Sequence, residues 1–111
     1  MLEVRAAERL ALVAGRGLAL SAREVALLEE LMRHQGHVVG REDLYARVWG
    51  SPLRDHDRSV DVYVHKLRAK LARVAPEWAF IHTHFVLGYR LDPTPSQVFH
   101  NPTTTPSQAV A

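Results

Sequence analysis

The chain has 111 residues, 14 Lys and Arg against 12 Asp and Glu, a formal net charge of +2 and no cysteine. This length is typical of one domain, and the lack of cysteine excludes a disulfide framework, a zinc–thiolate site and a thiol nucleophile. No apolar run approaches the roughly 18 residues of a membrane span and no signal peptide is recognisable, so we expect a cytoplasmic protein without a membrane partner.

The first twenty residues have the pattern of short strands. Residues 2–5 alternate between apolar and polar, residues 10–13 are apolar, and residues 14–17 supply turn chemistry before the apolar residues 18–20. We expect a small antiparallel sheet whose one face needs helices to cover it.

Two helices are predicted next. Residues 21–24 form a capping-box pattern, in which the Ser21 hydroxyl accepts from the Glu24 amide and the Glu24 carboxylate accepts from the Ser21 amide. Gly36 is well placed to end this helix, whose inward face carries Val25, Leu28, Leu31 and Met32. After an extended piece at 38–39, a second helix over 41–48 turns Leu44, Val48 and Trp49 inward. Residues 50–57 contain Gly and Pro and predict a loop.

Residues 57–71 predict a third helix with one apolar and one basic face. The apolar stripe, at i, i+4, i+7 and i+11, consists of Val60, Val64, Leu67 and Leu71. Asp57 is the expected N-cap, and the helix should end before Pro76. Between residues 58 and 73 there are five Lys or Arg and one acid, Asp61. A cationic side of this kind suits the edges and phosphates of DNA, and an ordinary solvated face is the alternative.

A β-hairpin is predicted from residues 80–84 and 88–91, with Gly88 permitting the turn between them. From residue 92 onward, prolines lie among polar residues, so we expect a folded domain over 1–92 and a flexible tail over 93–111. His82 and His84 project from one face of a strand, but two imidazoles without further ligands are weak evidence for a metal, and no cofactor is expected.

These elements, in this order, resemble the winged-helix effector domain of the bacterial OmpR/PhoB family of response regulators over residues 2–92. The specific motifs are Val48-Trp49-Gly50, Arg58-Ser59-Val60-Asp61-Val62 and Gly88-Tyr89-Arg90-Leu91. The resemblance implies an α+β winged helix-turn-helix fold that binds double-stranded DNA and regulates transcription. The third helix would lie in the major groove, and the hairpin would be a wing reaching the minor groove.

The resemblance also implies a regulatory context. Family members usually carry a phosphoacceptor receiver domain ahead of this one, and these 111 residues hold none. The chain is therefore either the effector half of a two-component regulator or a stand-alone factor. Pairing with a second copy as a tandem dimer on repeated half-sites is a further expectation.

The DNA-contacting residues implied by the resemblance are Arg58, Val62, Tyr63, His65, Lys66, Arg68, Lys70, Thr83 and Phe85. By physical role, Arg58 and Lys70 suit phosphates. Val62 suits a thymine methyl group, and His65 and Lys66 suit base edges. For Arg68 a structural role competes, namely pairing with an acid such as Asp61 or Glu42. Asp61 itself is expected to be structural, because its charge is wrong for DNA.

The hairpin tip departs from the family pattern. The family usually has Arg-Gly-x-Gly-Tyr there, whereas this chain has Phe85-Val86-Leu87-Gly88-Tyr89. The expected arginine is missing and the first glycine is a valine. Phe85 either enters the minor groove as an apolar wedge or folds inward onto Trp78 or Tyr89, and we favour the inward position.

An enzyme and a protein-interaction module are the two other classes of function to compare with DNA binding. We find no Gly-rich phosphate loop, nucleophile elbow or positioned acid pair, so an enzyme is not expected. A winged-helix module for protein–protein interaction is the alternative to DNA binding. Family members use the loop that corresponds to residues 50–57 to contact RNA polymerase, so Leu53 and Arg54 are candidates for that contact unless the loop is a spacer.

Overall fold

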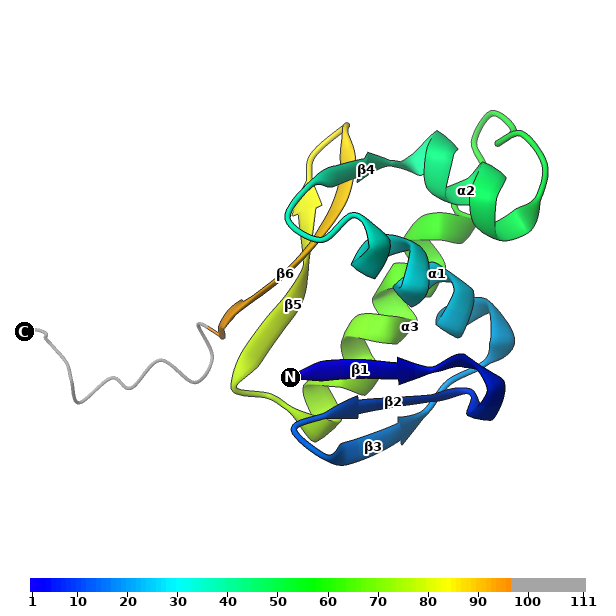
Figure 1. The fold of residues 1–111 in the computed structure, drawn as a ribbon. Coiled ribbons are helices and arrows are strands. Elements are labelled where there is room, and N and C mark those ends of the chain that lie inside the picture. The colour runs from blue at the N-terminus through cyan, green and yellow to red at the C-terminus, as the bar shows by residue number, and fades with distance from the viewer. Residues whose placement is uncertain (97–111) are drawn as a thin grey trace, which may run out of the picture.

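The computed structural model describes residues 1–96 as an α+β winged helix, which confirms the expected fold class (Figure 1). The N-terminal sheet has the antiparallel order β1–β2–β3, made of β1 (Leu2–Arg5), β2 (Leu10–Val13) and β3 (Arg16–Ala19), with a short 3-10 helix (Ala6–Glu8) after β1. Three helices follow: α1 (Ala22–Arg33), α2 (Arg41–Trp49) and α3 (Ser59–Val74). The second sheet has the order β4–β6–β5, made of β4 (Val38–Gly40), β5 (Trp78–His84) and β6 (Gly88–Pro95).

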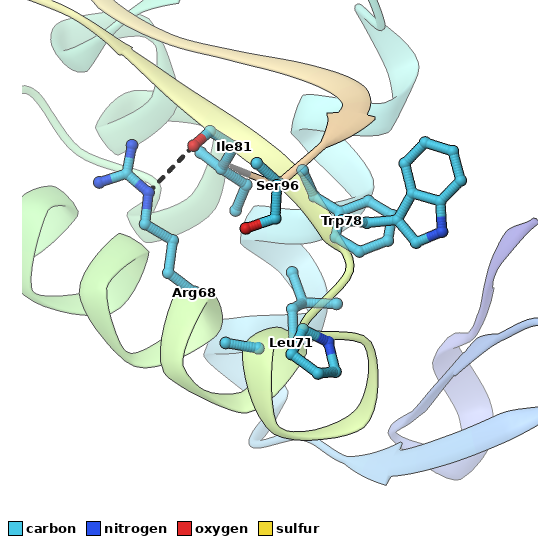
Figure 2. Close-up of a pocket in the computed structure, with 9 residues that line it drawn as sticks. Arg68, Leu71, Trp78, Ile81 and Ser96 are labelled. Atoms are coloured by element: carbon cyan, nitrogen blue, oxygen red, sulfur yellow. Dashed lines mark hydrogen bonds between the residues drawn. The ribbon is translucent and has the colours of Figure 1, made fainter. Parts of the chain in front are cut away.

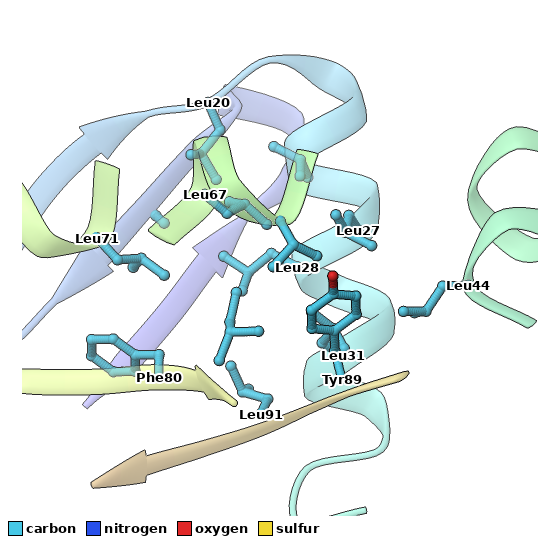
Figure 3. Packing of buried hydrophobic residues seen from close by; sticks show 14 of the residues in the cluster. Leu20, Leu27, Leu28, Leu31, Leu44, Leu67, Leu71, Phe80, Tyr89 and Leu91 are labelled. Carbon is cyan, nitrogen blue, oxygen red and sulfur yellow. The ribbon is translucent and has the colours of Figure 1, made fainter. Parts of the chain in front are cut away.

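The core lies where α1 and α3 pack against each other and against both sheets (Figure 3). All four residues of the predicted stripe on α3 are buried, namely Val60, Val64, Leu67 and Leu71. They meet the buried leucines of α1 and the wing residues Phe80, Tyr89 and Leu91. Because this stripe packs into the core, the opposite side of α3 faces outward.

The start of α1 has the predicted capping box. The Ser21 hydroxyl accepts a hydrogen bond from the Glu24 amide at 3.1 Å, and the Glu24 carboxylate accepts one from the Ser21 amide at 2.7 Å. The helix ends at Arg33, earlier than Gly36, which instead has a φ of +86° in the following turn and donates to the Leu91 carbonyl at 2.9 Å. Gly36 therefore directs the chain toward the second sheet.

The start of α3 differs by one residue from the expectation. The N-cap is Arg58, whose side chain caps nothing, and Asp57 lies just before it. The Asp57 carboxylate nevertheless accepts a hydrogen bond from the Ser59 amide at 2.8 Å, so it still satisfies one of the free amides of the first turn.

The wing sheet is longer than the sequence pattern indicated. The extended piece at 38–39 forms an edge strand that pairs Val39 with Tyr89, and β6 continues to Pro95, three residues into the segment that we assigned to the tail. Prolines are tolerated there because β4 covers only the first part of β6, which leaves the later part with one free edge. The rest of the predicted tail, residues 97–111, lies outside the described residues.

Gly88 is required by the close approach of β4 and β6. Its φ is +153°, and a Cβ placed on it would lie 2.0 Å from the Val39 carbonyl oxygen and 2.9 Å from the Cα of Gly40. These are backbone atoms of a paired strand, so they cannot move aside without breaking the pairing. The predicted need for glycine is thus confirmed, with strand contact as its main physical reason.

Gly88→Ala should therefore destabilise the domain by about 3 kcal/mol or more. Gly15→Ala is the matched control, because Gly15 also has a positive φ of +81° but has nothing within 4 Å of the added Cβ. It should cost only the backbone strain, about 1 kcal/mol. Thermal unfolding followed by circular dichroism measures both, and equal melting temperatures for the two variants would contradict the steric explanation.

Candidate nucleic-acid interface

The outward side of α3 has the mixture of groups predicted from its sequence. Arg58, Val62, His65 and Lys66 are all exposed there, and together with Asp61 they line a shallow hollow. Val62 is 48% exposed and is the apolar residue among those that line this hollow. The buried stripe fixes the helix backbone from which these side chains extend.

Tyr63 lies at the edge of this surface and is half-buried. Its ring meets Trp49 of α2 edge-on at 5.6 Å between centroids, and Trp49 stacks on Tyr45 at 4.9 Å. The Lys66 ammonium lies 4.6 Å from the centre of the Tyr63 ring. Tyr63 therefore links α3 to α2 and supports Lys66, so its contribution to the surface is mainly positional.

Asp61, the one acid among the cations of α3, joins three elements. It accepts hydrogen bonds from Arg41 of α2 at 2.8 Å, from Arg58 at 3.1 Å and from the Tyr89 hydroxyl of β6. Burial acts to raise the pKa of Asp61, but these hydrogen bonds and the charges of the two arginines outweigh it and hold the pKa below its ordinary value. Asp61 thus has the structural role that we expected.

Arg41 also belongs to this group of contacts around Asp61, and the sequence alone did not predict it. Besides its ion pair with Asp61, its guanidinium lies 5.0 Å from the centre of the Tyr89 ring. The three residues are separated by 20 and 28 positions, so no local spacing pattern could have connected them. The contact depends on the packing of α2, α3 and β6 against one another.

Arg68 has the structural role that we weighed against DNA contact, but its partners are not the acids Asp61 and Glu42 that we expected. Its Nε donates to the Ile81 carbonyl at 3.0 Å and its Nη2 donates to the Thr83 hydroxyl at 2.5 Å. Figure 2 shows this guanidinium at the border of an apolar hollow of about 280 Å³ between the end of α3 and β5. Burial lowers the pKa of Arg68. Two of the predicted site residues, Arg68 and Thr83, are therefore brought together, and their bond fixes the wing to α3.

Lys70 is directed away from the outward side of α3. Its ammonium lies 2.6 Å from a carboxylate oxygen of the buried Glu24 and 3.2 Å from the Ala19 carbonyl oxygen, and its side chain is only 28% exposed. A phosphate contact would require breaking this pair and leaving a buried carboxylate uncompensated. The structure therefore corrects the placement of Lys70 that we expected from the helix pattern.

The tip of the wing faces solvent, so the favoured inward position of Phe85 was wrong. Phe85 is 88% exposed, Val86 77% and Leu87 66%. The tip is a turn closed by a hydrogen bond from the Leu87 amide to the His84 carbonyl at 2.9 Å, which directs these side chains beyond the end of the sheet. Tyr89 is buried without help from Phe85.

The wing histidines are used within the hairpin. His82 donates to the Asp92 carbonyl at 2.7 Å, and His84 accepts from Arg90 at 2.9 Å. Among residues 1–96, no group of three or more His, Cys, Asp or Glu side chains could hold a metal ion. These two histidines therefore brace the strands of the wing.

The loop between α2 and α3 lies beside the wing tip. Arg54 is exposed and Leu53 half-buried, and both border a hollow that is also lined by Phe85 and Val86. The candidate contact loop and the wing tip thus belong to one continuous surface, although they lie about 30 residues apart in the sequence.

The winged-helix fold and the exposed face of α3 are typical of DNA-binding domains of transcriptional regulators. Comparison with known proteins leads to the same class. The profile of the family described as "Transcriptional regulatory protein, C terminal" matches residues 15–91. Transcriptional regulatory protein CreB of Escherichia coli is 39% identical over 74 residues, 67% of this chain and 32% of CreB. The DNA-binding domain of E. coli CpxR has a TM-score of 0.72 and 31% identity, covering 82% of this chain and 89% of that one. The Klebsiella pneumoniae RstA DNA-binding domain, solved with the RstA box, has a TM-score of 0.73 and 33% identity, covering 84% and 92%.

The chain therefore belongs to the OmpR/PhoB family of C-terminal domains of transcriptional regulatory proteins, as the resemblance of its motifs predicted. It spans about a third of the length of the curated relatives that it matches. A family of transcriptional regulators also agrees with the expectation that the chain is not an enzyme. Within residues 1–96, none of the helices combines the length and apolar character that crossing a membrane requires.

The Lys70–Glu24 pair generates a prediction about stability and pH. Burial acts to raise the pKa of Glu24, but hydrogen bonds from Lys70 and Ser21 and the charge of Lys70 outweigh burial and lower it. A carboxylate with a depressed pKa stabilises the fold above its unfolded pKa, and this contribution is lost as pH falls through the folded pKa. Lys70→Met should lower the free energy of unfolding by about 2 kcal/mol at neutral pH. The deficit of this variant should shrink as pH falls, because protonation of Glu24 removes the contribution of the pair from the wild type as well.

Thermal unfolding across a pH series tests this, with Lys66→Met as the control. Lys66 is an exposed cation on the same helix, so its removal should leave the pH profile in place. Identical profiles for the two variants would show that the Glu24 pair does not matter to stability.

Proposed function

We propose that this domain binds double-stranded DNA sequence-specifically and regulates transcription, with α3 in the major groove. The observation that carries the proposal is the exposed side of α3, where Arg58, Val62, His65 and Lys66 stand opposite a fully buried stripe. A helix of this kind fits the width of the major groove and can meet both phosphates and base edges. The solved RstA domain, which is similar in fold and sequence, is described in complex with DNA.

The side chains divide by chemistry into three roles. Arg58 is 77% exposed and held by one ion pair with Asp61, so it can turn to a phosphate at little cost. Val62 offers a surface for a thymine methyl group, and His65 and Lys66 offer donors to base edges. Tyr63, Arg68 and Thr83 act by holding α3 and the wing in place, and we leave Lys70 out of the interface because Glu24 occupies it.

The wider setting is proposed from the family. We infer that the domain is the output part of a two-component response regulator, located in the cytoplasm at the nucleoid. Residues 53 and 54 would contact RNA polymerase, and two copies would bind as a tandem dimer on repeated half-sites. We further propose that the DNA-binding unit is residues 1–92 with the added strand residues 93–95.

Selection of bound sequences from a random duplex library is the experiment that tests this function. Enrichment of a motif would support sequence-specific binding, and a motif repeated at a fixed spacing would support the tandem dimer. Recovery of unenriched DNA would contradict the proposal. The exposed apolar wing tip favours a protein-interaction module as the second candidate, which predicts no salt-sensitive retarded band with any duplex.

Single alanine variants on α3 should distinguish residues that contact base edges from residues that contact phosphates. Lys66→Ala should weaken binding to the selected site by about 1–3 kcal/mol and relax the preference at one base pair, because it removes a base-edge donor. Arg58→Ala should weaken binding to all sequences alike and reduce the salt slope by about one unit, because it removes a phosphate contact.

Arg5→Ala is the matched control for these variants. Like Arg58, Arg5 is an exposed arginine paired with a nearby acid, here Glu3 at 2.8 Å, but it lies on the N-terminal sheet. Its removal should leave specific binding unchanged. Equal effects of Arg5→Ala and Arg58→Ala in a salt titration would mean that overall charge, and not the α3 surface, governs binding.

The loop between α2 and α3 should affect activation without affecting DNA binding. Changing both Leu53 and Arg54 to Ala removes an apolar and a charged group from the loop and leaves the exposed α3 residues Arg58, Val62, His65 and Lys66 in place. We expect unchanged DNA affinity and reduced activation in a transcription assay reconstituted with RNA polymerase on a promoter that carries the selected site. Full activation by the double variant would assign the loop a spacer role.

A further inference from the structure

The wing tip is an uncharged apolar knob. Phe85, Val86 and Leu87 are consecutive and exposed, and no Lys or Arg lies between His84 and Tyr89. A wing tip without cations cannot contribute the attraction that narrow minor grooves exert on arginine. Three exposed apolar side chains are nevertheless costly for a soluble surface, and a grouping of this kind marks a binding site more often than chance. The tip is convex, so it suits a concave partner.

The knob is held rigidly. The turn bond from Leu87 to His84 closes it, and β6 is paired with β5 on one side and with β4 on the other at its very start. Val86 has a φ of +71°, a conformation that β-branched residues rarely adopt and that persists only where the surroundings enforce it. The Arg68–Thr83 bond ties the same hairpin to α3. The backbone of the knob is therefore braced by its own turn, by the neighbouring strands and by α3, so it can keep its shape on contact with a partner.

The knob also adjoins the proposed DNA surface. Phe85 and Val86 border one hollow together with Arg58 and Asp61 of α3. The charges of this hollow nearly cancel, since three arginines and four acids line it: Arg41, Arg54, Arg58, Glu42, Asp55, Asp57 and Asp61. The tip therefore continues the α3 interface in space but adds only apolar contact to it.

We propose that Phe85 is an apolar wedge that enters the minor groove beside the α3 site and partly unstacks a base step, so that the DNA bends. The proposal rests on the proposed DNA binding and adds a mechanism for it. Rigid apolar side chains on minor-groove binders act in this way, and the cost of unstacking is offset by stacking of the ring and by the extra contacts of bent DNA. Val86 and Leu87 would lie against the sugars on either side.

The test uses the selected duplex with a fluorescent donor and acceptor at its two ends. Wild-type protein should shorten the end-to-end distance, corresponding to a bend of about 20–90°. Phe85→Ser should remove most of the bend and weaken binding by about tenfold, as loss of one stacked aromatic group does. Phe85→Leu should keep much of the bend, because leucine is also an apolar wedge. Phe85→Arg should bind without the bend and with a steeper salt dependence.

Controls separate the outcomes. Val38→Ser changes an exposed valine of β4 that is not part of the tip and should bend DNA like the wild type. Melting temperatures of the Phe85 variants should equal that of the wild type, because the ring is exposed. Wild-type protein that binds tightly to straight DNA would overturn the wedge and leave the proposed function standing, as would full binding and bending by Phe85→Ser. In the latter case, loss of transcription activation would assign the tip to a protein partner. Failure of the wild type to bind any duplex would overturn both proposals.

Discussion

The carboxylate of Asp61 joins the outward face of α3 to α2 and to the wing. It is the meeting point of Arg41 at the start of α2, of Tyr89 in β6 and of α3 itself, so it joins elements that lie far apart in the sequence. Hydrogen bonds to a charged group are stronger than those between neutral groups, and bonds that share one acceptor in a network reinforce one another. The presence of Asp61 on a cationic helix is thus explained by its hydrogen bonds to Arg41 and Tyr89, and it needs no contact with DNA.

The third helix serves both the core and the proposed DNA interface, and different residues of the helix meet each of these two demands. Four apolar side chains face α1 and the sheets, while the outward side is free to carry groups chosen for recognition. Lys70 marks the boundary, because it belongs to a cationic sequence pattern but neutralises a buried acid of α1. Counting cations on a helix therefore overestimates the charge available to a ligand, since part of that charge balances the protein's own acids.

Local patterns predicted much of the fold, and tertiary contacts explain most of the errors. The capping box at Ser21 and the buried stripe of α3 follow from periodicity and backbone geometry, which act over a few residues. Gly88 was predicted from the turn, but the close contact of β4 with β6 is what requires it. Arg68 and Lys70 were misplaced because long side chains reach partners on other elements, here β5 and α1. Phe85 was misplaced because its hydrophobicity suggested burial, whereas the direction of the turn decides whether any core lies within reach.

If the wing enters the minor groove as proposed, an apolar tip favours other DNA sequences than an arginine does. A wing arginine is attracted by the potential of a narrow groove, so it favours stiff A-tracts and its contribution weakens with salt. A phenylalanine gains nothing from that potential, and its insertion is cheapest at pyrimidine–purine steps, which unstack easily. With this wedge, the domain would prefer flexible base steps next to its major-groove site. The affinity that the wing adds would depend little on salt, because no charge is involved. Replacing one charged side chain at the tip of a rigid hairpin would thus shift part of the specificity from groove width to deformability, without any change in α3.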